Sequence, residues 1–181
     1  MNFLRITVAG IAGALAVGPA MAADPPVPAP PLAAPPVVAA PAFDWNRFYL
    51  GAQAGVWFDV GPFGFNTFRV AGQVGKNFQV GDRMVLGFDL SAGTYFYGPP
   101  LDFEVHGKGR AGFLINDRVL LFASGGLGWD GTLGAVVGGG VEAAVGDRIS
   151  VVLESFGLWY FGDPSFSYVS VTAGVNFHFG R

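Results

Sequence analysis

The sequence contains no cysteine among its 181 residues. This absence excludes a disulfide framework, thiolate metal sites and lipid attachment through a lipobox cysteine. Charged residues are also scarce, at 13%, and they form no basic block of the kind that binds nucleic acid. Hydrophobic residues make up 51% of the chain, yet no apolar run beyond the first 22 residues is long enough to cross a bilayer as a helix. The apolar residues must therefore follow another pattern.

The amino-terminal residues predict a secretory signal peptide. Arg5 provides a positive head, residues 6–17 form a mostly apolar stretch, and Ala20-Met21-Ala22 matches an A-x-A cleavage site. The stretch is shorter than the ~20 residues that a membrane-spanning helix needs, which argues against the alternative of an uncleaved anchor. We therefore expect residues 1–22 to direct export and to be removed.

A proline-rich segment follows. Residues 23–42 hold eight of the thirteen prolines, a single charge at Asp24 and no aromatic side chain. This composition cannot build a core and favours an extended, largely polyproline II conformation. We predict that residues 23–44 form a linker in the periplasm, which serves either as a passive spacer or as a tether that touches the cell wall.

Three turns of one pattern divide the remaining residues, 45–181. They are Val80-Gly81-Asp82-Arg83, Ile115-Asn116-Asp117-Arg118 and Val145-Gly146-Asp147-Arg148, and each closes a run in which apolar residues alternate with small or polar ones. An even number of such strands behind an export signal is typical of an outer-membrane barrel. We predict an all-β fold, an eight-stranded antiparallel up-and-down transmembrane β-barrel. The expected strands span residues 48–58, 67–78, 84–97, 101–113, 119–129, 132–145, 149–161 and 168–179.

Alternation along each strand assigns the two faces, because successive side chains point to opposite sides of a sheet. In the fourth strand every polar group from Asp102 to Arg110 falls on one face, which a helix would scatter around its axis. Lys76 falls on the outer face, close enough to the rim to snorkel. The other strand charges form a predicted lumen charge network: Arg69, Asp89, Glu104, His106, Lys108, Arg110, Glu142 and Glu154.

Prolines and aromatic residues distinguish the two ends of the barrel. Pro62, Pro99, Pro100 and Pro164 lie between expected strands at one end, which we predict to face outward, with both termini in the periplasm. Two aromatic belts are expected at the headgroup levels. The outer belt comprises Trp57, Phe58, Tyr95, Phe96, Tyr97, Trp129, Trp159, Tyr160 and Phe161. The periplasmic belt comprises Trp45, Phe48, Phe78, Phe113, Phe177 and Phe179.

The start of the predicted barrel carries a family resemblance. The run from Trp45 to Gly55, WNRFYLGAQAG, resembles the W-x-x-F-Y-V-G-x-x-x-G opening of small alphaproteobacterial outer-membrane β-barrel proteins, often labelled porin-like or surface antigen. The signal peptide, the Pro/Ala leader and the closing run from Gly174 to Phe179 are similar too. The resemblance implies an eight-stranded barrel with a structural, surface-antigen or, in some members, haem-binding role.

The lumen residues favour a structural role. Eight strands enclose just enough room for side chains, so we expect paired charges to plug the interior. The alternative function is a low-conductance pore or a surface protein that binds a small ligand such as haem. His106 and His178 are expected to lie far apart, which disfavours a metal or haem site between them. His106, Glu104 and Ser124 are the one possible catalytic remnant, and they point inward, so we expect no enzyme activity and no cofactor.

Four aspartates lie in or beside the expected outer loops, namely Asp59, Asp102, Asp130 and Asp163, and no basic residue accompanies them. Such a ring of outer-rim carboxylates would hold divalent cations that bridge lipopolysaccharide phosphates. The alternative is that aspartate simply favours turns, as in Asp130-Gly131. The expected partners are outer-membrane lipid, lipopolysaccharide and the barrel-assembly machinery.

Overall fold

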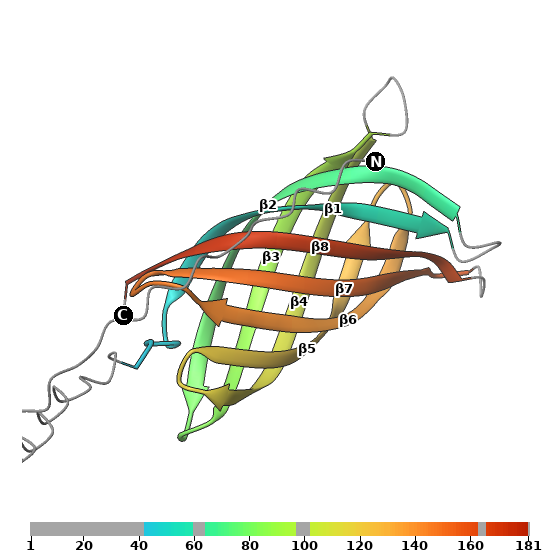
Figure 1. The fold of residues 1–181 in the computed structure, drawn as a ribbon. Coiled ribbons are helices and arrows are strands. Elements are labelled where there is room, and N and C mark those ends of the chain that lie inside the picture. Colours follow the sequence, from blue (N-terminus) through green and yellow to red (C-terminus); the bar gives the residue numbers. More distant parts are fainter. Residues whose placement is uncertain (1–41, 60–63, 97–101, 163–165, 181) are drawn as a thin grey trace, which may run out of the picture. The chain divides into compact units, whose positions relative to one another are not determined.

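The computed structural model describes residues 42–59, 64–96, 102–162 and 166–180, with residues 59, 64–66, 166 and 167 described by their backbone alone. Eight strands form a closed antiparallel barrel in sequence order, and β1 pairs with β8 to complete the ring (Figure 1). The strands are β1 (Phe48–Asp59), β2 (Gly64–Val80), β3 (Met84–Tyr95), β4 (Asp102–Asn116), β5 (Val119–Trp129), β6 (Leu133–Ala144), β7 (Ile149–Tyr160) and β8 (Phe166–Phe179). The predicted eight-stranded barrel is confirmed.

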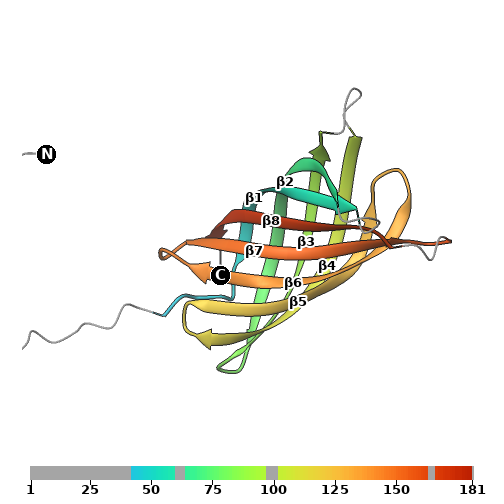
Figure 2. The same cartoon turned by 45° about the vertical axis from the view of Figure 1, so that its right-hand side comes forward.

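The short turns and the end of β8 gather at one end of the barrel, at the left and lower left of Figure 1. We call it the turn end. The opposite end, where β1 joins β2, β3 joins β4, β5 joins β6 and β7 joins β8, is the loop end. At the turn between β2 and β3, Gly81 has a φ of +67°, a left-handed conformation that glycine adopts without steric cost. The turned view in Figure 2 shows the β2–β3 hairpin reaching beyond the start of β1. The four prolines all lie between strands, outside the described residues.

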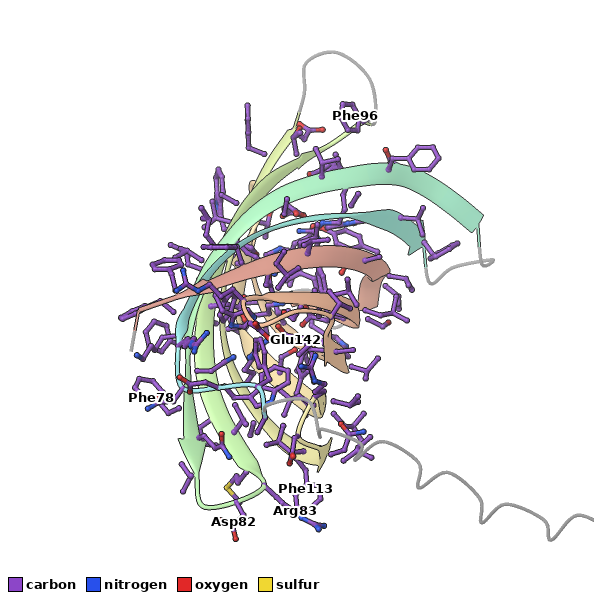
Figure 3. The ribbon with its side chains drawn as sticks, turned by 60° about the vertical axis from the view of Figure 1, so that its left-hand side comes forward. Phe78, Asp82, Arg83, Phe96, Phe113 and Glu142 are labelled. Atoms are coloured by element: carbon purple, nitrogen blue, oxygen red, sulfur yellow. The ribbon has the colours of Figure 1, made fainter. Side chains whose placement is uncertain are left out.

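The two faces of the strands differ in chemistry, as the alternation predicted. In β4, Glu104, His106 and Lys108 are buried, whereas the neighbouring Phe103 and Val105 are exposed. Figure 3 shows Glu142 inside the barrel, with Phe78 and Phe113 pointing away from it. The outer face is therefore largely apolar and suited to lipid. No helix in the described part of the chain is long and apolar enough to cross a membrane.

Two tryptophans assigned to the aromatic belts lie inside the barrel instead. Trp57 in β1 is 2% exposed, and Trp45, just before β1, is 0% exposed. Trp57 lies at an odd position of a strand whose odd residues face inward, so alternation overrides the belt assignment. Trp45 packs with Phe43 in a core cluster that includes Leu114 and Leu120. Phe43 thus belongs to the barrel core, whereas the sequence placed it in the linker.

The assignment of faces predicts a large difference between two arginine substitutions. Val171→Arg lies on the outer face within β8 and should destabilise the barrel by ~2–4 kcal/mol if it meets the bilayer midplane. Val80→Arg, on the same face at the end of β2, should cost ~0–1 kcal/mol, because its charge reaches the interface. Urea unfolding in lipid vesicles measures both. Equal costs would contradict the placement of Val171 in the apolar band.

Candidate functional site in the barrel interior

All eight residues of the predicted lumen charge network are buried. They come from five strands, and their side chains form three ion-paired groups, centred on Glu104, Glu142 and Glu154. These groups lie in a space that eight strands leave just wide enough for side chains. In each group a cation donates a hydrogen bond directly to a glutamate carboxylate.

The first group lies toward the loop end. Arg69 of β2 donates through Nε to Oε1 of Glu104 in β4, at 2.7 Å. His106, two residues along the same face, places Nε2 3.8 Å from the second oxygen of Glu104. The ring of Phe156 in β7 lies beside both, 5.2 Å from the Arg69 guanidinium and 5.2 Å from the His106 ring. An aromatic face thus shields the charged pair from one side.

The second group lies toward the turn end and centres on Glu142 of β6. Arg110 donates to Oε2 of Glu142 at 2.7 Å, and Asn176 donates to Oε1 at 2.9 Å. The Ser150 hydroxyl also donates to Oε1, so its oxygen accepts from His178 Nε2 at 2.8 Å. This carboxylate has a partner on each of its oxygens, which is what a charge with no solvent exposure requires.

Three side-chain amides link the first group to the second through hydrogen bonds that all run in the same direction. Arg69 donates to the Gln53 carbonyl at 3.1 Å, Gln53 donates to Gln73, and Gln73 donates to Asn176. Asn176 then donates to Glu142. Every amide turns its oxygen toward the guanidinium of Arg69 and its NH2 group toward the carboxylate. We call Arg69, Gln53, Gln73, Asn176 and Glu142 the interior hydrogen-bond chain.

Lys108 holds a separate set of carboxylates. Its ammonium lies 2.7 Å from both oxygens of Glu154, which also accepts from the Ser124 hydroxyl at 2.8 Å. Asp89 is more loosely placed: its Oδ1 lies 3.8 Å from the Lys108 ammonium and accepts no hydrogen bond from the described residues. Lys108 therefore pairs mainly with Glu154.

Glycines on the inner face make room for the large side chains. At Gly75 in β2, an added Cβ atom would collide with the ring and hydroxyl of Tyr49 in β1. The Tyr49 ring in turn lies 5.0 Å from the Arg110 guanidinium. The interior is thus filled by large polar groups set against residues without a side chain, and this accounts for part of the high glycine content.

Aromatic side chains gather at the loop end. Trp57 stacks on Tyr95 with ring centroids 5.2 Å apart, and it also contacts Tyr168. Asp130 accepts hydrogen bonds from the hydroxyls of Tyr160 and Tyr168. The predicted outer-rim carboxylate at Asp130 is therefore engaged by two phenols.

The remaining outer-rim aspartates behave differently. Asp102 is exposed, whereas the side chains of Asp59 and Asp163 lie outside the described part of the molecule. Within that part, no group of three or more His, Asp or Glu side chains is arranged to hold a metal ion.

Two aromatic residues before β1 pack into the turn end of the barrel. Phe43 and Trp45 pack with inward side chains of six strands, and both rings contact His178, at centroid distances of 4.9 and 6.2 Å. The Trp45 indole donates to the carbonyl of Asp117 in the β4–β5 turn at 3.2 Å. We call Phe43 and Trp45 the aromatic seal.

The residues considered for catalysis do not assemble into a catalytic arrangement. Ser124 donates to Glu154, while His106 faces Glu104, so the serine and the histidine serve different carboxylates. The two histidines also lie beside different carboxylates, His106 beside Glu104 and His178 beside Glu142. The base within hydrogen-bond reach of Ser124 is thus the Glu154 carboxylate, both oxygens of which also accept from the Lys108 ammonium, and not His106.

Sequence reasoning missed the seal and the amides of the chain as site residues. Alternation places Gln53, Gln73 and Asn176 on the inner face, where they are buried, but nothing local indicates that they join. Their signal is indirect: uncharged polar residues at inward positions of three strands that meet at the barrel closure.

Comparison with known proteins supports the fold. No protein-family model and no curated protein matches the sequence. Among solved structures, the N-terminal β-barrel domain of OprF from Pseudomonas aeruginosa aligns with a TM-score of 0.52 and 14% identity, covering 72% of this chain and 97% of that chain. Ail, the attachment invasion locus protein of Yersinia pestis, aligns at 0.55 and 9% identity, covering 74% and 97%. Neisserial surface protein A aligns at 0.50 and 16% identity, covering 73% and 97%. At these identities the likeness shows a shared barrel fold.

Removing one member of a buried ion pair should be costly. Arg110→Met leaves the Glu142 carboxylate without its cation, and we expect a loss of ~3–5 kcal/mol in the free energy of unfolding. Adding Glu142→Gln, which keeps an acceptor for Asn176, should recover most of that loss. Urea unfolding of the two single variants and the double variant measures the coupling. Strictly additive losses would show that the pair is not an interacting unit.

The aromatic seal should contribute more to stability than an aromatic residue facing lipid. Trp45→Ala removes a fully buried ring and should cost ~3–5 kcal/mol. The matched control is Trp129→Ala, whose ring is 49% exposed on the outer face and should cost less. Unfolding in detergent micelles, where both variants experience the same solvent, tests this. A larger loss for Trp129→Ala would contradict the burial of the seal.

Proposed function

We propose that this chain is an exported structural protein of the outer membrane, whose barrel is closed to solutes by its own side chains. Three features support export and membrane insertion. The first residues match a signal peptide, the outer face is apolar, and the barrel resembles in fold a domain of OprF and the surface protein NspA. A periplasmic linker over residues 23–42, which ends before Phe43 because that ring lies in the barrel core, and a place among small alphaproteobacterial surface barrels belong to the same proposal.

The interior hydrogen-bond chain carries the proposal of a closed lumen. It crosses the barrel from β2 through β1 and β8 to β6, and its members are each 7% exposed or less. The side chains that a solute would have to displace are thus bound to one another and to buried charges. Opening a path would leave at least one of these groups unsatisfied, at a cost of ~1–3 kcal/mol for each neutral group and more for a charged one.

The two closed ends add to this barrier. Trp57 and its tyrosine neighbours cover the loop end, and the aromatic seal covers the turn end. The engagement of Asp130 by two phenols favours a role in this closure over a role in cation binding. The barrel thereby leaves its outer face, its rims and the leader free for contacts with lipid, lipopolysaccharide and the assembly machinery.

Single-channel recording on refolded full-length protein tests the proposal. Insertion is checked first, by flotation with liposomes. Wild-type protein should show no resolvable conductance step in a planar bilayer. The Phe43→Ala/Trp45→Ala variant should remain closed, because the interior hydrogen-bond chain still crosses the lumen. Trp129→Ala removes an aromatic ring from the outer face and controls for a general effect of ring loss on conductance.

Two outcomes would count against this function. A large, steady wild-type conductance would favour the alternative of a pore. A conductance step that appears only in the Phe43→Ala/Trp45→Ala variant would show that the aromatic seal blocks the lumen and that the interior hydrogen-bond chain does not.

A further inference from the structure

The outer face of the strands carries one charged side chain in the described part of the molecule, that of Lys76 in β2. All other charged side chains described within the strands point inward or lie at a strand end. A charge on the face that meets lipid costs ~2–4 kcal/mol at the midplane and less near an interface. Lys76 is thus an exception that calls for a compensating interaction.

Aromatic rings surround the Lys76 side chain. Phe48 of β1 lies directly opposite it on one side, and Phe88 of β3 lies opposite on the other. The ammonium is 4.2 Å from the centroid of the Phe48 ring and 5.6 Å from that of Phe78. The rings cover the residue until only 9% of it is exposed. Cation–π contacts hold the ammonium in place but do not neutralise its charge.

Lys76 differs from the interior cations in its lack of an anion. Arg69, Lys108 and Arg110 each form an ion pair with a glutamate. Among the described residues, Lys76 has no ion pair with a carboxylate. The described residues therefore supply the aromatic part of a binding site without its counter-ion.

The position of Lys76 in the barrel indicates where that anion comes from. Phe48 is the first residue of β1, and its ring stacks on that of Phe179, the last residue of β8, at 6.2 Å. Lys76 thus lies at the level where β1 and β8 end, beside an aromatic cluster of the kind that marks the headgroup level of a bilayer. The anionic group present at that level, on the lipid side of the wall, is a phospholipid phosphate.

We propose that Lys76, Phe48 and Phe78 form a binding site for the headgroup phosphate of an anionic phospholipid. The ammonium pairs with the phosphate, and the rings contact the glycerol and the upper acyl chain. A lipid such as phosphatidylglycerol suits this site better than a zwitterionic lipid, whose own ammonium competes for the same phosphate. The inference rests on the proposed insertion into a membrane and adds a specific lipid site to it.

Native mass spectrometry of the full-length protein, released from vesicles of phosphatidylglycerol and phosphatidylcholine, tests the site. We expect wild-type protein to retain one phosphatidylglycerol, and Lys76→Met to lower the retained fraction about fivefold, the change expected when one basic side chain near an anionic surface is lost. Lys76→Arg keeps the charge and should retain the lipid. Arg148→Met removes the same charge from the exposed β6–β7 turn and should leave retention unchanged.

Each other outcome has a distinct meaning. Failure of the wild-type protein to insert into the vesicles would overturn the proposed function and not the lipid site alone. Normal insertion with equal lipid retention in wild-type and Lys76→Met would overturn the lipid site and leave the function standing. Equal losses in Lys76→Met and Arg148→Met would show general attraction to an anionic surface. Displacement of the lipid by millimolar inorganic phosphate would show a site for a soluble anion. Both results overturn the inference.

Discussion

The pairing of β1 with β8 is the constraint on which the rest of this structure depends. It gives every strand two neighbours, so no backbone edge remains to be satisfied within a bilayer. It also encloses an interior only wide enough for side chains. Charged residues drawn into that space cannot be solvated freely, so each must find a partner inside. The ion pairs and amide contacts of the interior follow from this closure.

The interior hydrogen-bond chain shows how closure and charge act together. A guanidinium at one end and a carboxylate at the other leave each intervening amide one favourable orientation, with its oxygen toward Arg69 and its NH2 group toward Glu142. Reversing any one amide would place two donors or two acceptors against each other. The two charges therefore order three neutral side chains on three different strands. Hydrogen bonds to charged groups are also the stronger ones, which anchors both ends.

The local sequence pattern predicted the strands and their faces, because two-residue alternation and turns with glycine or aspartate both depend on neighbouring residues in the chain. The same pattern could not predict which inward residues meet. Gln73 and Asn176 are 103 residues apart, and they join only because the ring closes between their strands. Phe43 and Trp45 precede the first strand, so alternation assigns them no face. For Trp57, alternation indicates the inner face, where the side chain lies, whereas its position among aromatic residues near the rim suggested the outer face.

A barrel that fills its interior in this way has little chemistry left inside it. The described interior arginines and lysine are matched with carboxylates, the amides of the interior hydrogen-bond chain are matched with each other, and both ends carry aromatic side chains. Under the proposed closure of the lumen, contacts that serve a function are made from outside, by the loops, the rims and the apolar wall. On that wall a charge without a carboxylate partner is more informative than any paired charge within, because hydrocarbon cannot solvate it. Among the described residues no carboxylate pairs with the Lys76 ammonium, which lies between phenylalanine rings on the face that meets the membrane.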